Sequence, residues 1–187
     1  MTTTENAYPY LIREASPDEY TAIGQLTWEG FGYHLPGSPQ PSPDRRELLL
    51  DAESRANEGV LLVAEDTRTG RLLATATVLP SCSPLNEQAR TGESELKMLA
   101  VLPEARRTGL GSLLLHEAVR VASEQGAQRL VLDTAVDNEA SHVFYRSFGF
   151  ARRPDRERER PTPKVQLAVF TFDISNTNHC KEGSADQ

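Results

Sequence analysis

The sequence predicts a single mixed α/β domain, in which strand-like and helix-like segments alternate over residues 8–173. Length is the first reason, because 187 residues make one ordinary domain and are too few for two. Composition is the second, because 38% hydrophobic and 25% charged residues can form one buried core with a solvated surface. The third is a strand–helix–strand pattern over residues 95–135, which implies locally parallel pairing with a right-handed crossover.

Apolar periodicity and turn residues give the expected order β-α-α-β-β-β-α-β-α-β-β. The main predicted segments are a strand at 10–14, helices at 17–29 and 43–56, hairpin strands at 60–65 and 72–79, a strand at 95–101, a helix at 110–125, a strand at 129–135, a helix at 138–148 and a strand at 164–173. Loops are expected at 30–42, 80–92 and 151–164. Residues 1–7 and 176–187 are polar and aperiodic, which predicts disordered ends.

Capping residues set the expected helix boundaries. Ser16, Pro17 and Glu19 form a capping-box pattern at the start of the first helix. Ser42 and Pro43 give a similar start to the second helix. Glycine suits the left-handed position just after a helix. The glycines expected to end helices are Gly30, Gly126 and Gly149.

Charge and cysteine usage exclude several classes of function. The chain has 20 basic and 27 acidic residues, a net charge of −7, which argues against a general nucleic-acid binder. Cys82 and Cys180 lack the spacing for a disulfide framework or zinc site, and the histidines have no paired spacing for a metal. The N-terminus does not resemble a secretory signal, and no apolar run could span a membrane. We therefore expect a cytoplasmic protein with neither membrane nor nucleic-acid partner and no metal.

A strand-to-helix turn within residues 95–112 carries the strongest functional signal. The strand leads into a turn with Gly109 and Gly111, and the turn opens directly onto a helix. Backbone N–H groups at a helix start lack intrahelical partners, and the helix dipole adds positive partial charge. Glycine lets a bulky anion approach the backbone closely. The segment therefore predicts an anion cradle suited to a pyrophosphate, with Arg106 and Arg107 as cations at its rim.

Three other interpretations compete for this turn. A Walker A loop needs Lys after its last glycine, whereas Gly111 is followed by Ser112 and Leu113. A dinucleotide-binding fingerprint could use Asp133, about 20 residues further on, for a ribose. However, Leu114 stands where the third glycine of that fingerprint is needed. The third is an ordinary helix start with solvated arginines, which is the commoner outcome for a short glycine motif alone.

Two sequence blocks together resemble the GNAT superfamily of acyl-CoA N-acyltransferases. Arg106, Gly109 and Gly111 meet the family pattern Arg/Gln-x-x-Gly-x-Gly/Ala, which follows the fourth strand. A second family-like block at residues 138–150 lies at the expected distance downstream. The element order is similar over residues 8–173, which is nearly the whole chain.

The resemblance implies a mostly antiparallel, twisted sheet with splayed fourth and fifth strands, flanked by helices. In this fold the pantetheine arm of acetyl-CoA lies between the splayed strands, where it satisfies strand N–H and C=O groups that would otherwise be unpaired. The implied pantetheine-binding residues are Leu99, Ala100 and Val101. The implied pyrophosphate-binding residues are Arg106, Arg107, Thr108, Gly109, Leu110, Gly111 and Ser112.

The helix at 138–148 is expected to line the same cofactor. Asn138, Ser141 and Tyr145 lie three and four residues apart on one flank, and this spacing suits a helix edge along a cleft or a solvent-exposed edge. The neighbouring apolar face is expected to consist of Ala140, Val143, Phe144 and Phe148.

The reaction that the resemblance implies is direct transfer from a thioester to an amine, without a cysteine nucleophile. A lysine-like amine has a pKa of about 10.4 and an α-amine of about 8, so a base or water relay must remove a proton. Glu95 is the candidate base by its family position; the alternative is a polar residue at a strand end. Tyr145 is the candidate proton donor to the CoA thiolate; the alternative is a packing role. A strand N–H group could polarise the carbonyl.

The remaining notable side chains have mainly structural interpretations. His116 and His142 are expected to be solvated, and the aromatic residues near His34 to pack or anchor a loop that covers the acceptor in GNAT folds. Residues 152–160 with Lys164 hold six basic and three acidic residues. They are expected to form a solvated loop of alternating charge. Alternatively, this segment overhangs the acceptor mouth and favours an amine that carries a carboxylate.

Together these observations predict acetyl transfer from acetyl-CoA to a primary amine of a small molecule. The acidic balance of the chain favours a small acceptor over a histone-like or nucleic-acid-bound target. Two alternatives stay open: acetylation of a protein N-terminus or lysine, and a non-catalytic module that senses acyl-CoA. Acyl-chain length and oligomeric state stay open, and a homodimer is a candidate state.

Overall fold

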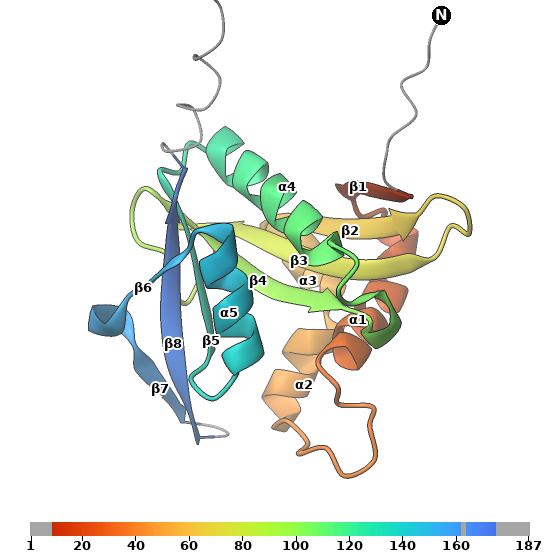
Figure 1. The fold of residues 1–187 in the computed structure, drawn as a ribbon, viewed down its shortest axis with the longest axis horizontal. Coiled ribbons are helices and arrows are strands. Elements are labelled where there is room, and N and C mark those ends of the chain that lie inside the picture. The colour runs from red at the N-terminus through yellow and green to blue at the C-terminus, as the bar shows by residue number, and fades with distance from the viewer. Residues whose placement is uncertain (1–8, 162–163, 175–187) are drawn as a thin grey trace, which may run out of the picture. The chain divides into compact units, whose positions relative to one another are not determined.

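The computed structural model describes residues 9–161 and 164–174 and has the predicted mixed α/β class (Figure 1). Its strands are β1 (Tyr10–Glu14), β2 (Val60–Asp66), β3 (Leu72–Pro80), β4 (Glu93–Val101), β5 (Arg129–Ala135), β6 (Ala151–Arg152), β7 (Arg158–Pro161) and β8 (Lys164–Asp173). Its helices are α1 (Tyr20–Gly30), α2 (Pro43–Leu50), α3 (Ala52–Glu58), α4 (Leu110–Glu124) and α5 (Glu139–Phe148), with short 3-10 turns η1 (Pro17–Glu19), η2 (Pro103–Ala105) and η3 (Pro154–Arg156). The ends predicted to be disordered, 1–7 and 176–187, lie outside the described residues.

The strands form a sheet in the order β1-β2-β3-β4-β5-β8-β6, and β7 pairs with β8 off this path. Pairing is antiparallel for β1–β2, β2–β3, β5–β8, β6–β8 and β7–β8. β4 and β5 are parallel from Glu93↔Arg129 to Glu95↔Val131. The mostly antiparallel sheet with one parallel pair confirms the predicted fold class, and the splay of β4 from β5 beyond Glu95 stays a prediction. None of the described helices is long and apolar enough to cross a membrane.

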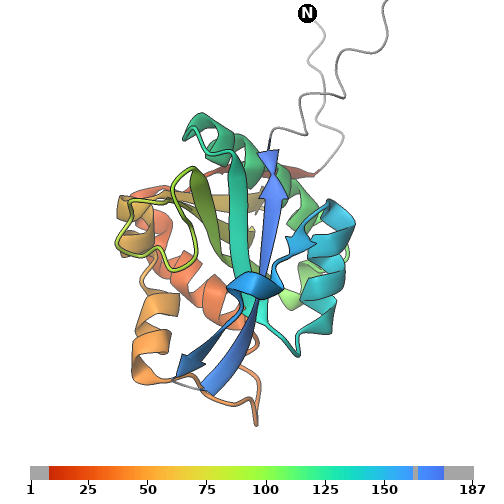
Figure 2. The same ribbon diagram turned by 90° about the vertical axis from the view of Figure 1, so that its left-hand side faces the viewer.

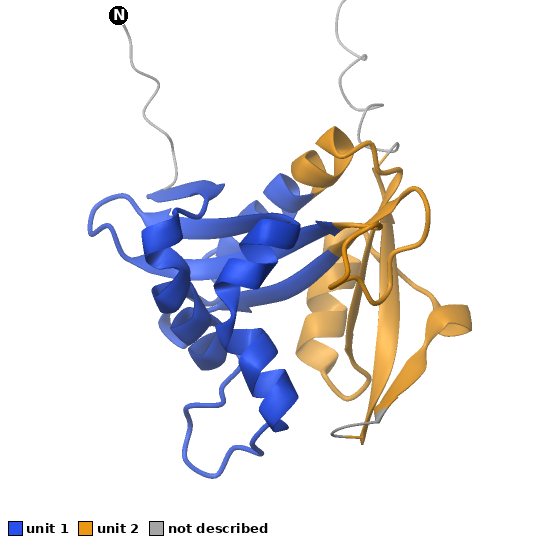
Figure 3. Ribbon diagram, turned by 180° about the vertical axis from the view of Figure 1, so that it is seen from behind, with its two compact units in different colours: residues 1–79, 96–118 blue, residues 80–95, 119–187 orange. Residues whose placement is uncertain are grey.

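Two compact units divide the chain (Figure 3). Unit 1 contains residues 1–79 and 96–118, and unit 2 contains residues 80–95 and 119–187. β4 and α4 therefore each contribute residues to both units. The single domain expected over residues 8–173 stays a prediction.

Unit 1 packs helices α1 and α3 against the N-terminal strands. Its core cluster joins Ile23 of α1, Ala52 of α3 and the β2 residues Leu61 and Val63. Leu61 and Val63 point to the same face of the sheet because side chains in a strand alternate with a period of two. The hairpin of β2 and β3 predicted from the sequence is confirmed.

The predicted helix at 43–56 is wrong as one element, because it breaks at Asp51 into α2 and α3. Asp51 leaves helical geometry, with φ −80° and ψ 78°. Its carboxylate accepts a hydrogen bond from the Ser54 N–H at 2.9 Å and so caps α3. This is a typical N-cap interaction, and the apolar spacing on both sides of Asp51 conceals it.

The break places a buried arginine, Arg55, at the centre of unit 1. Its guanidinium donates to the hydroxyls of Thr27 and Thr77, both at 3.2 Å, and to the carbonyls of Leu49 at 3.2 Å and Asp51 at 3.3 Å. Burial lowers the pKa of Arg55 to about 10, so the group is still charged at neutral pH. Arg55 thus ties α1, α2, α3 and β3 together.

In unit 2, α5 packs on β8 through a face that differs from the predicted one. Val143 was expected on the apolar face but is 66% exposed, whereas His142 and Tyr145 are buried. The His142 ring lies 5.1 Å from the ring of Phe170 and its Nε2 atom lies 3.0 Å from the Ala135 carbonyl oxygen. The expectation of a solvated His142 is therefore wrong, because an imidazole can pack on an aromatic ring while its nitrogen is hydrogen-bonded.

The described part of the predicted loop 151–164 contains regular elements. Instead of one loop, it contains β6, the 3-10 turn η3 and β7, and Figure 2 shows β7 beside the first residues of β8. Its alternating basic and acidic residues suit a strand with one inward and one outward face as well as they suit a solvated loop.

Candidate functional site

The turn between β4 and α4, in unit 1, forms the predicted helix start. α4 begins at Leu110, and its first bond of the helical type runs from the Leu113 N–H to the Gly109 carbonyl at 3.1 Å. The N–H groups of residues 109–112 therefore precede the helical hydrogen-bond ladder. Together with the positive end of the helix dipole, these groups can hold an anion.

The backbone of this turn leaves room for a ligand at Gly109. Gly109 has a φ of 85°, and a Cβ placed on it would meet no atom of the described structure within 4 Å. Arg107 has a φ of 61°, which is uncommon for a residue with a side chain and is often found at ligand sites. The Thr108 hydroxyl donates to the Ala105 carbonyl at 2.7 Å and fixes the turn. The residues present therefore fit a pyrophosphate cradle.

The two arginines of the turn have different roles. The guanidinium of Arg106 donates to the carbonyl of Val101 at 3.3 Å and to that of Gly30 at 2.9 Å, so it ties the end of β4 to the end of α1. Arg107 is exposed. Arg106 is thus partly a structural residue, which the sequence motif alone does not reveal.

The end of β4 is irregular and closely packed on one side. Met98 has a φ of 53°, which interrupts regular strand geometry, as bulges beside binding sites do. A Cβ on Gly30 would lie 2.9 Å from the Ala100 Cβ and 3.3 Å from the Val101 nitrogen. The chain of α1 therefore approaches the segment 99–101, whose binding of pantetheine stays a prediction.

In unit 2, Glu95 is a buried carboxylate held by a loop. Only 1% of Glu95 is exposed, and its Oε2 atom accepts the N–H groups of Glu87 at 2.6 Å and Gln88 at 3.1 Å. A carboxylate bound by two backbone donors has a fixed position. The carboxylate thus fixes the loop to β4, and its role as a catalytic base stays a prediction.

Tyr145 is buried on the inner face of α5. It is 8% exposed, and its ring packs on Phe150 at 5.6 Å and on Phe170 at 6.1 Å between centroids. Burial, and to a smaller extent the negative charge of Asp133, raise the pKa of Tyr145 above its ordinary value. The hydroxyl therefore keeps its proton at neutral pH.

A polar pair formed by Gln88 and Asp133 is a further feature of unit 2, and the sequence motifs do not identify it. The side-chain amide of Gln88 donates to Oδ2 of Asp133 at 2.8 Å. Arg158 of β7 lies 3.6 Å from the same carboxylate oxygen. Gln88 belongs to an aperiodic loop, and Asp133 enters the sequence motifs only as the ribose ligand of the dinucleotide-binding alternative, so no local signal identifies this pair.

Asn138 and Ser141 lie together at the start of α5. The Asn138 side-chain oxygen accepts the Ser141 N–H at 3.2 Å and caps the helix. Asn138 is exposed and Ser141 is half-buried. Capping accounts for Asn138 without a ligand, and cofactor binding by both residues stays a prediction.

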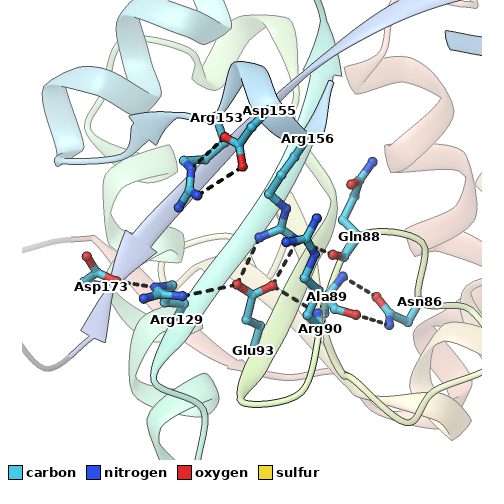
Figure 4. A network of polar contacts seen from close by, with 10 residues as sticks. All are labelled: Asn86, Gln88, Ala89, Arg90, Glu93, Arg129, Arg153, Asp155, Arg156 and Asp173. Carbon is cyan, nitrogen blue, oxygen red and sulfur yellow. Dashed lines mark hydrogen bonds and ion pairs between the residues drawn. The ribbon is translucent and has the colours of Figure 1, made fainter. Parts of the chain in front are cut away.

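A buried ion pair anchors the loop that precedes β4 (Figure 4). Arg156 donates to both carboxylate oxygens of Glu93, each at 3.0 Å, and also to the Gln88 carbonyl. Burial alone would raise the pKa of Glu93, but the bonds from Arg156 and the Arg90 N–H, and the charge of Arg129, hold it below its ordinary value. Glu93 is therefore ionised at neutral pH.

This pair corrects the interpretation of residues 152–160 as a solvated loop. Arg156 is 8% exposed and so cannot act as a surface cation at an acceptor mouth. Neighbouring cations also have acidic partners: Arg152 with Glu157, Arg153 with Asp155, and Arg158 with Glu87. Arg156 packs inward because arginine can make several hydrogen bonds at once in a fixed plane, whereas the neighbouring pairs are partly exposed.

An aromatic group lies at the end of α1 in unit 1. The Trp28 and Tyr33 rings are 5.1 Å apart, and Phe31 stacks on Tyr33 at 6.3 Å. From α2, the Arg45 guanidinium lies over Phe31 at 5.9 Å and that of Arg46 over Trp28 at 5.2 Å. These contacts support the expected packing role.

A sequence model of the Acetyltransferase (GNAT) family matches residues 20–150. The chain belongs to the GNAT acetyltransferase family. This match covers both the β4–α4 turn and the α5 block, so the predicted resemblance is confirmed.

Among GNAT relatives, the N-alpha-acetyltransferase 30 of Schizosaccharomyces pombe is 42% identical over 57 residues, which are 30% of this chain and 38% of that protein. An uncharacterized N-acetyltransferase of the same yeast is 34% identical over 107 residues, covering 57% of this chain and 60% of the relative. The matches thus cover less than two thirds of these curated relatives.

Solved structures share the GNAT fold. One of them is yncA of Salmonella typhimurium, which is assigned as an acetyltransferase and was solved with its cofactor acetyl-CoA. This chain superposes on yncA with a TM-score of 0.64 and 18% identity, over 96% of this chain and 99% of yncA. The ribosomal-protein-S18-alanine N-acetyltransferase of Escherichia coli gives a TM-score of 0.63 and 18% identity over 88% of this chain and 94% of its own.

Proposed function

We propose that this chain is an N-acetyltransferase that moves an acetyl group from acetyl-CoA directly to a primary amine of a small molecule. The observation that carries the proposal is the helix start at residues 109–112, with its open backbone at Gly109, inside the region matched by the family. Acetyl-CoA, as co-substrate, supplies the activated thioester. The protein supplies binding, orientation and proton transfer.

Donor binding is assigned to backbone groups more than to side chains. The N–H groups of residues 109–112 would hold the pyrophosphate, and Arg107 would add a positive charge at its edge. The backbone of residues 99–101 would bind the pantetheine arm. Asn138 and Ser141 are the remaining candidates for contact with the donor.

Glu95 and Tyr145 are assigned complementary roles in proton transfer. Glu95, directly or through a water molecule, takes the proton that the ammonium acceptor must lose before its nitrogen can attack. The new C–N bond forms as the C–S bond breaks, and the CoA thiolate needs a proton. Tyr145 is assigned as the donor of that proton, since its hydroxyl is protonated at neutral pH, although burial raises its pKa and so makes it a weaker acid than an ordinary tyrosine.

The acceptor is proposed as a small amine because the acidic chain, with its net charge of −7, attracts cationic amines. The second candidate acceptor is a protein N-terminus. It is favoured by two relatives: N-alpha-acetyltransferase 30, and a protein of Bacillus subtilis named for alanine acetylation of ribosomal protein bS18, which is 33% identical over 57 residues. An aminoglycoside N(6′)-acetyltransferase of Acinetobacter haemolyticus, 36% identical over 55 residues, favours the small amine.

A thiol-release assay separates these functions. The full chain is incubated with acetyl-CoA and with aminoglycosides, polyamines, amino acids or N-terminal peptides, and free CoA is measured. Release that depends on a small amine supports the proposal, and release only with peptides supports the second candidate. Calorimetric binding of acetyl-CoA without release for any amine would contradict both and support a sensor.

A further inference from the structure

The ion pair of Arg156 and Glu93 lies next to the candidate base but is not part of the proposed chemistry. Both side chains are nearly fully buried, and the residues are 63 positions apart in the chain. A buried pair often contributes little to stability, because desolvation offsets the attraction between the charges. Stability alone is therefore a weak explanation for placing an arginine of η3 at this position.

Gln88 connects this pair to the candidate base Glu95 and to Asp133. Its carbonyl accepts a hydrogen bond from Arg156, its N–H donates to Glu95, and its side-chain amide donates to Asp133. One loop residue thus links the guanidinium to two carboxylates. Displacing the Gln88 backbone would alter the contacts of both.

The strand geometry brings the two glutamates to the same side of the sheet. Glu93 and Glu95 are two residues apart in β4, so their side chains point to the same face. The loop before β4 lies on this face: the Arg90 N–H binds Glu93, and the N–H groups of Glu87 and Gln88 bind Glu95. The loop is consequently held at both of its ends by β4 carboxylates.

The geometry points to Arg156 as a positioning residue, which fixes the loop 86–90 so that its backbone N–H groups hold the Glu95 carboxylate in place. This inference rests on the proposed role of Glu95 as the base. Arg156 does not touch the reacting groups, and it acts through Glu93 and Gln88. Lysine could not replace it, because a single ammonium group lacks the planar fork that reaches both Glu93 oxygens and the Gln88 carbonyl together.

The same turn provides a matched control. Arg153, three residues before Arg156, pairs with Asp155 at 3.2 Å, but this pair is exposed. Arg153→Gln therefore removes an arginine and an ion pair at the N-cap of η3, and the described hydrogen bonds of the Arg153 side chain go to Asp155 and not to the loop 86–90. Because Arg156→Met leaves Glu93 charged and buried, the double variant Arg156→Met with Glu93→Gln serves as a second test without the unpaired charge.

The first measurement does not depend on activity. Amide hydrogen exchange at Glu87 and Gln88 reports whether their N–H groups stay bound to Glu95. We expect exchange at both amides to become at least about tenfold faster in Arg156→Met and in the double variant, and to stay unchanged in Arg153→Gln. Unchanged exchange in folded Arg156 variants would overturn the inference, whatever reaction the protein catalyses.

The second measurement is a double-mutant cycle on turnover. Arg156→Met should lower kcat about tenfold with the KM for acetyl-CoA unchanged, because the pyrophosphate cradle is built by other residues. In a Glu95→Gln background the same substitution should change kcat less than about twofold, since a residue acting through Glu95 has nothing left to position. Equal losses in both backgrounds would overturn the inference. Full activity of Glu95→Gln alone would instead refute the proposed base, and with it a catalytic role for Arg156.

Discussion

At the scale of single residues, Tyr145 gives the most direct test of the proton donor. Phenylalanine would keep the ring contacts with Phe150 and Phe170 and remove only the hydroxyl. We expect Tyr145→Phe to lower kcat by about 10²-fold, a common effect of losing a general acid, while the affinity for acetyl-CoA stays within about twofold. Thiol-release kinetics and calorimetry measure the two quantities. Wild-type kcat in this variant would leave Tyr145 with a packing role only.

Glu93 gives a residue-scale prediction for pH. Its pKa in the folded protein lies below the ordinary 4.5, so between these two values the unfolded chain binds more protons. Its stabilising contribution is therefore complete above pH 4.5 and is lost as the pH falls through the folded pKa. Glu93→Gln lacks this contribution and leaves Arg156 without its carboxylate partner, so it should cost about 3–5 kcal/mol at neutral pH.

The difference in unfolding free energy between wild type and Glu93→Gln should shrink as the pH drops below about 4.5, because Glu93 of the unfolded wild-type chain then takes up a proton, and at lower pH Glu93 of the folded chain does so too. Urea unfolding of both proteins at a series of pH values measures this difference. A gap that stays constant down to pH 3 would show that Glu93 is not the titrating group. Other carboxylates also titrate in this range, which is why the difference, and not the wild-type curve, is the test.

At the scale of elements, local patterns predicted most of the fold. Alternating apolar residues located the hairpin, and the glycine after α5 ended it as expected, with Gly149 at a φ of 117°. The failures have non-local causes. The break at Asp51 is stabilised by Arg55, which bonds to α1 and β3 as well as to the break itself. The inward face of α5 is set by its contacts with β8, which periodicity within the helix does not contain.

The approach of α1 to β4 supports an element-scale prediction. Gly30→Ala would place a methyl group 2.9 Å from the Ala100 Cβ, so the end of α1 or the segment 99–101 must shift. We expect a loss of about 1–3 kcal/mol in the free energy of unfolding, as for overpacked cores, and a higher KM for acetyl-CoA. The exposed neighbour variant Glu29→Ala should change neither. Denaturant unfolding and steady-state kinetics measure the two quantities. An unchanged KM would show that the segment 99–101 of β4 does not take part in binding acetyl-CoA.

At the scale of the whole molecule, the sequence predicted the turn at the start of α4 better than the surroundings of Glu95. Glycine, arginine and a helix start are adjacent in sequence, so a short motif can report them. The environment of Glu95 is assembled from the loop before β4, from β5 and from η3, and Gln88 and Arg156 are 68 residues apart. Such contacts follow from sheet order, and sequence spacing alone contains no signal for them.

Ligand binding offers a prediction for the molecule as a whole, because a donor that binds only the folded state stabilises the entire chain. At a concentration of about 100 times its Kd, acetyl-CoA should add about 2.7 kcal/mol to the free energy of unfolding. For a protein of this length that corresponds to a rise in Tm of about 5–10 °C. Gly109→Ala should reduce this rise strongly, since its Cβ would enter the open space of the cradle and its φ of 85° strains any side chain.

Gly70→Ala is the matched control, because Gly70 has a φ of 70° and equally open surroundings but lies in the turn between β2 and β3. Both substitutions should lower the Tm of the ligand-free protein by a similar amount, through backbone strain of about 1–2 kcal/mol. Only Gly109→Ala should also lose the acetyl-CoA-dependent rise. Thermal unfolding with and without acetyl-CoA measures all four values. An equal rise in both variants would mean that the donor binds elsewhere than at the start of α4, and the assignment of the pyrophosphate cradle would then fail.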